Sequence, residues 1–497
     1  MKVKYPILLV LIFLSVLGFR LFFEFQSASF STSDDYFHLR EIDSVKKDLK
    51  VFYYDPLSYN GRQLYFMPVF YYIMGILAMI FGDVFALKIF PAVISSLVVF
   101  AIASIVKEIT GRDNIALISA FAGGFLPIFI FLTTNTINPH FMIAPLFLLV
   151  INYMIKCSRS KKKFLHLIIF SVILTILHPF SFMIVFASWL YLLLLRIDNI
   201  EIKNYFFEYT LFLSFLWYTI YYFIFADGAF VLSSGILSLG MPSSLFSKYF
   251  TAFSFVRAFS GVGAIICLLG LYGAYKSISK KEGASANLIL TSIFMVIFLF
   301  TLLRLLRLSE ALSYFGFILV ILSAVTMDGL FPYAKKMKHR APRVLLSIGV
   351  VLAILISEIT ASVYESNLQI SRQMPKDTIK AMDWQKNQNA TGAVLGNYEE
   401  GSIISYFSGM QNVMDTNFGW GLNTQERLSD IKTVYTTMLQ TQALEITQKY
   451  NIRYIMLTEA TKSDYNIESL KFIENSNCFP LIYNNSVQIY RVECNLN

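Results

Sequence analysis

Long apolar segments recur along this chain from its start to about residue 360, and they limit what it can fold into. Most are close to the ~20 residues that a helix needs to cross a bilayer. Hydrophobic residues make up 56% of the 497 residues, while charged residues make up 15%, below the level typical of soluble domains. We therefore expect a polytopic α-helical membrane protein. The expected spans are Tyr5–Phe23, Ala86–Val106, Ile115–Leu132, Phe141–Ile155, Phe164–Leu177, Phe180–Leu195, Tyr205–Phe225, Phe253–Tyr275, Leu288–Leu303, Ala311–Leu330 and Val344–Ile359.

The short apolar segment Val69–Phe81 decides the predicted topology. If it lies at the membrane interface or re-enters the membrane, the short Lys and Arg runs between the other segments all fall on one side, as the positive-inside rule requires. This gives about eleven spans plus interfacial helices in the cell membrane, with a cytoplasmic N-terminus and an extracytoplasmic tail. The net charge of +9 then reflects topology, and we expect no nucleic-acid partner.

Two domains are expected. Residues 1–361 form the membrane domain, with an outer loop over residues 24–85, and residues 362–497 form a soluble extracytoplasmic α/β domain. Apolar periodicity predicts helices and strands in this tail, and Cys478 and Cys494 flank a hairpin-like stretch and can pair if the tail is outside. The predicted elements are helices at Thr378–Asn387 and Leu428–Tyr450 and strands at Gly392–Leu395, Tyr454–Leu457 and Val487–Val492.

Two adjacent carboxylates, Asp34 and Asp35, follow the first span in the sequence Ser-Asp-Asp-Tyr-Phe-His-Leu-Arg. At a membrane surface such a pair can hold a divalent cation or accept a proton from a substrate. The alternative is a solvated loop in which Asp34 caps a short helix that runs through Glu41. The residues alone leave both interpretations open.

A second outer turn carries Asn138 and His140. Together with Asp34 they are candidate ligands of a metal ion, because hard cations favour oxygen ligands and tolerate an imidazole. The alternative, which the sequence by itself favours, is that Asn138-Pro139 starts a helix with proline at its first position.

Arg304 and Arg307 stand one turn apart at the outer end of a predicted span, with Glu310 close behind. The arginine fork suits phosphate oxygens, which makes a lipid phosphate or pyrophosphate a natural ligand. The alternative is that both side chains reach toward water or lipid headgroups. Arginine on the outer side opposes the positive-inside trend and favours a functional role.

These outer-loop residues resemble those of a known family. The run from Asp34 to Arg40, followed by Tyr-Asp-Pro-Leu-Ser-Tyr, is similar to the first outer loop of the oligosaccharyltransferase catalytic subunit, above all the archaeal dolichyl-phosphooligosaccharide–protein glycotransferases of the GT-C superfamily. The resemblance extends weakly over the whole chain. It implies that Asp34 binds a divalent metal and helps to hold the acceptor, and that Arg307 contacts the donor phosphates. The triplet Asn138-Pro139-His140 corresponds to the family's second acidic loop motif, in which His140 fits and Asn138 departs.

The tail departs from that family. Where the family has Trp-Trp-Asp-Tyr-Gly, which binds the sequon Ser or Thr, this chain has Asn-Tyr-Glu-Glu-Gly, with Glu399, Glu400 and Gly401 as candidate acceptor-binding residues. Asp227 is the one acidic residue from 227 to 248, so nothing further matches the family's loop glutamate. The acceptor is therefore open among a protein, a lipid and a glycan.

The leading hypothesis is a membrane glycosyltransferase. It moves a sugar or oligosaccharide from a polyprenyl- or dolichyl-linked (pyro)phosphate donor on the outer face, with Asp34 and Asp35 as catalytic carboxylates and Mn²⁺ or Mg²⁺ as cofactor. A second hypothesis is a metal-free transferase that uses a polyprenyl-monophosphate sugar. A glycolipid transporter and a non-catalytic paralogue that binds glycolipid are the competing classes. No P-loop and no Gly-x-Ser-x-Gly elbow occurs, which disfavours nucleotide-driven transport and serine hydrolysis.

Overall fold

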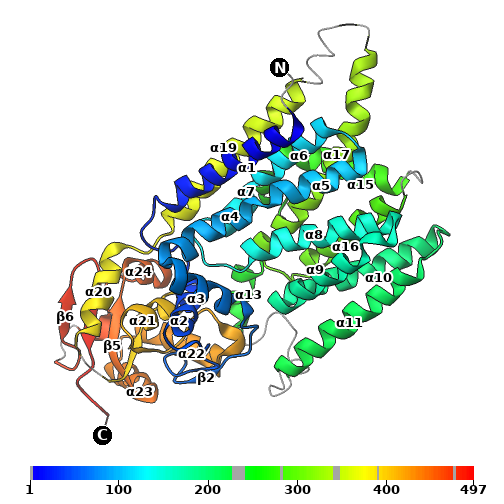
Figure 1. The fold of residues 1–497 in the computed structure, drawn as a ribbon. Helices are drawn as coiled ribbons and strands as arrows, with labels where there is room; N and C mark the ends of the chain where they lie inside the picture. The colour runs from blue at the N-terminus through cyan, green and yellow to red at the C-terminus, as the bar shows by residue number, and fades with distance from the viewer. Residues whose placement is uncertain are drawn as a thin grey trace.

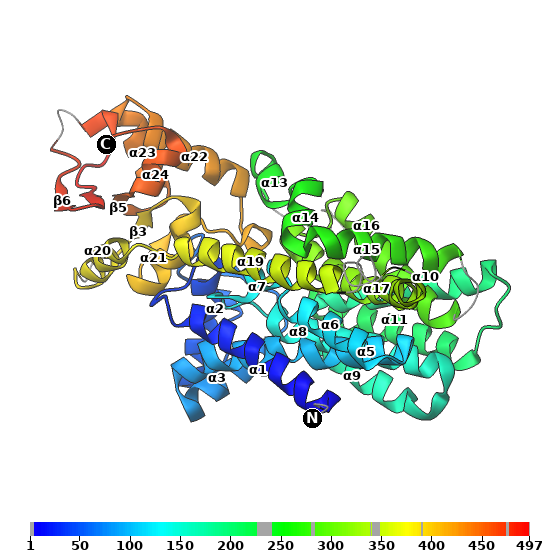
Figure 2. The same ribbon diagram turned by 90° about the horizontal axis from the view of Figure 1, so that it is seen from above.

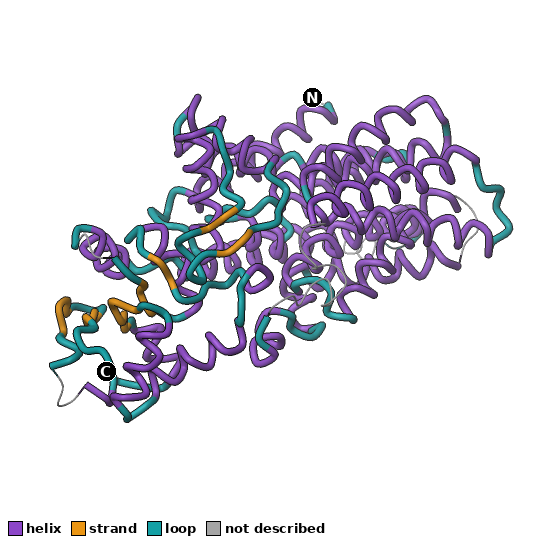
Figure 3. Tube along the Cα trace, turned by 90° about the horizontal axis from the view of Figure 1, so that it is seen from below, coloured by secondary structure: helices purple, strands orange, loops and turns teal. Residues whose placement is uncertain are grey.

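A long helical bundle carries an α/β domain at one end (Figure 1). The computed structural model describes residues 4–225, 241–279, 284–337, 339, 348–388, 391–473 and 477–496. The bundle and the α/β domain follow each other along the long axis of the molecule, with helices α2 and α3 beside the domain (Figure 2). The strands lie in the part of the molecule that the α/β domain and the loop after α2 form (Figure 3).

Each predicted span that lies in the described residues is helical. The helices of this part are α1 (Tyr5–Glu24), α2 (Ser33–Asp48), α3 (Val69–Phe81), α4 (Phe90–Ser96), α5 (Val98–Thr110), α6 (Asp113–Gly124), α7 (Pro127–Thr133), α8 (His140–Arg159), α9 (Phe164–Leu177), α10 (Phe182–Ile197), α11 (Asn204–Phe225), α13 (Ser243–Tyr249), α14 (Phe255–Val262), α15 (Ala264–Ser279), α16 (Ala284–Leu302), α17 (Leu308–Lys336) and α19 (Val350–Ser371).

The described residues contain seven helices long and apolar enough to cross a membrane, or nine if each of two bent pairs counts as one span. In the first pair, Pro127 starts α7 after α6, and the two helices meet at 43°. In the second, Gly263 adopts φ +88° between α14 and α15, which bend by 104°. The remaining two of the eleven predicted spans are α9 and α11, which pack on each other in the bundle. The chain is a multi-pass membrane protein.

Helix α3 has the bounds expected for an interfacial helix. It is 13 residues long, ends at Gly82 with φ +84°, and packs against α2. Its other face leaves Ile76, Met79 and Ile80 exposed. An amphipathic helix of this length lies in a membrane interface more readily than across it.

The C-terminal domain, which the sequence analysis expects to be soluble and which is called the soluble domain below, is a small α/β unit, as predicted. Its five-stranded sheet has the order β4-β3-β5-β7-β6, in which β3 pairs in parallel with β4 and β5, and β7 pairs antiparallel with β5 and β6. The disulfide Cys478–Cys494 closes the β6–β7 hairpin, which confirms the proposed pairing. Its strands are β3 (Ala393–Leu395), β4 (Gln411–Asn412), β5 (Ile452–Leu457), β6 (Leu481–Asn484) and β7 (Gln488–Arg491), and its α-helices are α20 (Lys376–Lys386), α21 (Gly401–Phe407), α22 (Thr424–Thr436), α23 (Gln440–Lys449) and α24 (Glu459–Tyr465).

Two expected helices need correction. Helix α19 continues without a break to Ser371, past Ile359, the expected end of the last span, because a helix follows backbone hydrogen bonding and not hydropathy alone. The helix expected over Leu428–Tyr450 is two helices, since α22 ends at Thr436 and α23 begins at Gln440. The chain carries two Asn-x-Ser/Thr sequences, which start at Asn389 and Asn484. Asn389 lies outside the described residues, and Asn484 is the last residue of β6.

Candidate active site

Helix α2 begins with a capping box that uses Asp35. The Thr32 hydroxyl accepts from the Asp35 N–H at 3.3 Å, and Asp35 Oδ2 accepts from the Thr32 N–H at 2.7 Å. Its other oxygen accepts from the Ile137 N–H at 2.7 Å, which joins α2 to the turn before α8. Asp35 is 2% exposed, and burial raises its pKa to about 7. Both oxygens of Asp35 are thus occupied by backbone contacts.

Asp34 points the other way, toward two residues that are distant in sequence. Its Oδ2 lies 3.3 Å from Arg307 Nη1, and its Oδ1 accepts from the Thr416 hydroxyl at 2.5 Å. Burial by itself would raise the pKa of Asp34, but the Arg307 charge and the Thr416 hydrogen bond outweigh it, so this pKa lies below its ordinary value. The side chain remains 28% exposed. Asp34 is therefore an ionised carboxylate that substrate can reach.

Arg307 stands at the turn between α16 and α17, as its place in the sequence suggested. Its guanidinium also lies over the Tyr249 ring of α13, 5.9 Å from the centroid, and its side chain is 42% exposed. Only one of its nitrogens reaches Asp34 within 3.5 Å, so most of the five guanidinium donors remain for a ligand. Arg304 lies in the same turn, where its φ of +54° reverses the chain after α16.

Of the three expected metal ligands, Asn138 and His140 are engaged in contacts away from Asp34. Asn138 Oδ1 accepts from the His140 N–H at 3.0 Å, and α8 starts at His140, so this pair begins a helix. His140 is buried, with Nδ1 2.7 Å from the Tyr314 hydroxyl and Nε2 3.8 Å from Glu310 Oε1. In the described part of the chain, no group of three or more His, Cys, Asp or Glu side chains is arranged to hold a metal ion. These donors, as arranged, do not fit the divalent cation that the resemblance implied.

The three tail residues expected at the acceptor lie in and beside a short 3-10 helix over Tyr398–Glu400. Glu400 is buried and accepts from the Asn397 N–H and the hydroxyls of Thr458 and Thr461. Burial raises the pKa of Glu400 to about 7. Its contacts hold the domain together internally.

Glu399 and Gly401 face other parts of the molecule. Glu399 is half-exposed and pairs with Lys248 of α13 at 2.7 Å, so it faces α13. Gly401 allows close packing, because a Cβ there would lie 2.1 Å from the Met414 carbonyl oxygen.

Two functional candidates were not visible in the sequence. Thr416 reaches Asp34 across 382 positions of the chain, and Tyr249 lies against both Arg307 and Phe418, whose ring centroid is 5.4 Å from its own. No motif marks either residue. The Tyr-Asp-Pro stretch at Asp55 was part of the family resemblance. It is the one sequence signal that pointed toward the contact between the outer loop and the soluble domain.

The sequence matches no protein-family model and no curated protein. Solved structures match in fold. The apo oligosaccharyltransferase of Archaeoglobus fulgidus has a TM-score of 0.72 at 13% identity, over 92% of this chain and 70% of that one. ArnT of Cupriavidus metallidurans bound to undecaprenyl phosphate has a TM-score of 0.58 at 11% identity, over 99% and 98%. The chain thus has the GT-C fold of membrane glycosyltransferases.

Other structures of the archaeal protein carry ligands. Archaeoglobus fulgidus AglB with an inhibitory peptide and a dolichol-phosphate has a TM-score of 0.65 at 13% identity, over 89% of this chain and 69% of that one. The same protein has also been solved with Zn and sulfate. These ligands are known for that protein, and at this level of identity the likeness establishes the fold.

Proposed function

We propose that this chain is a glycosyltransferase that uses a sugar linked to a polyprenyl or dolichyl phosphate. It works at the outer face of the cell membrane. The observation that carries the proposal is the pairing of Asp34 with Arg307, an ionised, reachable carboxylate next to a guanidinium with donors to spare. A base and a phosphate-binding cation at one point are what glycosyl transfer from a lipid phosphate requires. The solved proteins of this fold include one bound to dolichol-phosphate and one bound to undecaprenyl phosphate, which supports the donor class.

In this mechanism Asp34 is the general base. The acceptor nucleophile attacks the anomeric carbon of the donor while its proton passes to Asp34, the bond from that carbon to the phosphate oxygen breaks, and the phosphate leaves with the electron pair. Arg307 and Arg304 stabilise the charge that develops on the leaving phosphate. A single displacement inverts the anomeric configuration. Because the lipid of the donor stays in the bilayer, the reaction takes place at the membrane surface.

Arg307 supplies the positive charge at the carboxylate, and no step passes through a metal ion. Asp35 holds the start of α2 instead of taking part in proton transfer, since both of its oxygens are bound. In this proposal the tail faces the acceptor through Glu399, which pairs with Lys248 of α13. The product of the assay below identifies the acceptor as a protein, a lipid or a glycan.

The test is transfer by the purified chain with a lipid-linked glycan extract, an Asn-x-Thr peptide, and membrane lipids, with and without a chelator. Glycopeptide identifies oligosaccharyl transfer to Asn, whereas donor consumption without glycopeptide identifies a lipid or glycan acceptor. The Asp34→Asn variant is expected to lose transfer in either case. An intact donor with the wild-type chain contradicts the proposal and favours a non-catalytic protein that binds or transports glycolipid.

A further inference from the structure

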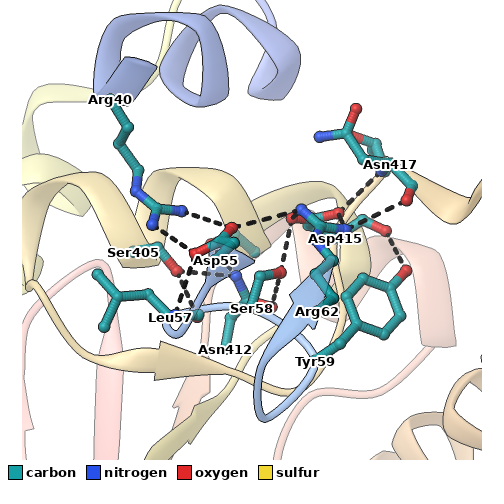
Figure 4. A network of polar contacts seen from close by, with 12 residues as sticks. Arg40, Asp55, Leu57, Ser58, Tyr59, Arg62, Ser405, Asn412, Asp415 and Asn417 are labelled. Atoms are coloured by element: carbon teal, nitrogen blue, oxygen red, sulfur yellow. Dashed lines mark hydrogen bonds and ion pairs between the residues drawn. The ribbon is translucent and has the colours of Figure 1, made fainter. Parts of the chain in front are cut away.

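A chain of buried ion pairs connects helix α2 to the soluble domain (Figure 4). Arg40 of α2 donates to both oxygens of Asp55, at 2.6 and 3.1 Å. Arg62 lies 3.6 Å from Asp55 and donates to both oxygens of Asp415, at 2.9 and 2.6 Å. The side chains of Arg62, Asp55 and Asp415 are fully buried. These four residues, Arg40, Asp55, Arg62 and Asp415, are called the ion chain below.

Further hydrogen bonds hold Asp415, the end of the ion chain that lies in the soluble domain. Asp415 also accepts from the Ser58 hydroxyl at 2.7 Å and from the Asn417 N–H at 2.8 Å, and its carbonyl accepts from the Tyr59 hydroxyl at 2.8 Å. Gly401 lets α21 pack directly on the backbone of this segment, where a Cβ would lie 2.8 Å from the Asp415 Cβ. The backbone on both sides of position 416 is therefore fixed.

Thr416 is the next residue, and its hydroxyl donates to Asp34 at the start of α2. Helix α2 consequently meets the soluble domain through Asp34 and Thr416 at its N-terminus and through the ion chain from Arg40 six residues later. Between these positions the Tyr36 ring packs against the rings of Tyr406 and Phe407. Within the described residues, the membrane domain supplies Arg307 as the one other hydrogen-bond donor to the Asp34 carboxylate. The candidate site is incomplete without the soluble domain.

We propose that Thr416 is a positioning residue for Asp34, placed by the soluble domain through the ion chain. The hydroxyl fixes the rotation of the carboxylate by occupying one lone-pair site of Oδ1, while Arg307 occupies one of Oδ2. The remaining lone pairs then point at the acceptor. This inference rests on the proposed function for its catalytic meaning, and the contact itself does not depend on it.

Activity of three variants tests the positioning role. Thr416→Val removes the hydroxyl at nearly constant shape, and we expect kcat to fall about ten- to hundredfold, the range set by a hydrogen bond to a charged group. The KM for the lipid donor should stay unchanged, because Arg304 and Arg307 are untouched. Thr416→Ser keeps the hydroxyl and should restore kcat. Thr433→Val makes the same chemical change on the exposed face of α22 and is the matched control.

Two outcomes of these assays would overturn the proposal. One is a Thr416→Val enzyme with normal kcat. The other is a Thr416→Ser enzyme as slow as Thr416→Val, since that result reflects shape and not the hydroxyl.

The role of the ion chain is tested with Asp415→Asn, with Asp383→Asn on exposed α20 as control. If Asp415 places Thr416, Thr416→Val lowers kcat much less in the Asp415→Asn background than in the wild-type background. Independent, multiplicative losses in kcat would overturn placement through the ion chain.

A thermal double-mutant cycle tests the contact without any activity. Asp34→Ala and Thr416→Val should lower the melting temperature by less in combination than the sum of their separate effects, because they remove the same hydrogen bond. Additive effects overturn the inference even if transfer is observed. Coupling in a chain without transfer supports the contact while the proposed function fails, so the two failures are distinguishable.

Discussion

Arg62→Met is the substitution whose effect can be worked out furthest from the contacts. It removes the bidentate partner of Asp415 at a fully buried position and keeps most of the side-chain volume. Breaking a buried ion pair on one side costs about 3–5 kcal/mol, because a charge is left buried without its partner. Asp55 retains Arg40, and Asp415 retains the Ser58 hydroxyl and the Asn417 N–H, which places the expected loss at the lower end, about 3 kcal/mol.

This loss is measured as a melting temperature. The soluble domain and the outer loop form a unit of about 200 residues, for which 1 kcal/mol corresponds to about 2–4 °C, so Arg62→Met should lower its melting point by about 6–12 °C. Trp384 and Trp420 lie in the soluble domain and report its unfolding by fluorescence in purified, detergent-solubilised protein.

A double-mutant cycle separates the ion pair from general damage. Arg62→Met combined with Asp415→Asn should cost clearly less than the sum of the two single variants, because the second substitution removes the unpaired charge that the first leaves behind. A melting point unchanged in Arg62→Met, or additive losses in the double variant, would refute the reasoning that the ion pair joins the two domains.

Four further outcomes are expected. Asp34→Asn should lower transfer about 10²- to 10⁴-fold as a general base is lost, while Asp48→Asn at the end of the same helix leaves the rate unchanged. Removing divalent cations with a chelator should leave transfer unchanged, and recovery that requires Mn²⁺ would contradict the role given to Arg307. Burial raises the pKa of Glu400 to about 7 from its ordinary value of 4.5, so the unfolded chain loses this proton first and stability falls as pH rises from 4.5 to 7. Glu400→Gln should therefore reduce the slope of melting temperature against pH over this interval. Replacing Cys478 and Cys494 by serine opens a loop with a sequence separation of 16 and should cost the soluble domain about 3 kcal/mol, seen as a lower melting point that reductant does not lower further.

Asp34 and Arg307, two residues that the resemblance to archaeal oligosaccharyltransferases singled out, lie 3.3 Å apart in the structure. Other residues that it singled out make different contacts. The Asn138 side-chain oxygen accepts from the His140 N–H just before α8. Helix α8 therefore begins at this turn, as the alternative interpretation expected, although Pro139 is its N-cap and His140 takes the first helical position. Glu400 is bound by hydroxyls of its own domain, which no local pattern announces. Adjacent residues on a helix point about 100° apart, so of the two carboxylates only Asp34 faces Arg307 while Asp35 turns to the backbone.

The features that the sequence determined by itself are those that depend on nearby residues or on the summed hydrophobicity of a segment. Apolar length produced the membrane helices and the short α3, and alternating apolar residues between two cysteines produced the β6–β7 hairpin, because these signals depend on residues close together in the chain. Only the tertiary structure decided what surrounds Asp34. Arg307 and Thr416 lie 273 and 382 positions away, and their approach depends on how the bundle, the outer loop and the soluble domain pack. A buried ion chain holds that packing, and the pairing of its charges is a property of three-dimensional proximity that no spacing along the chain encodes.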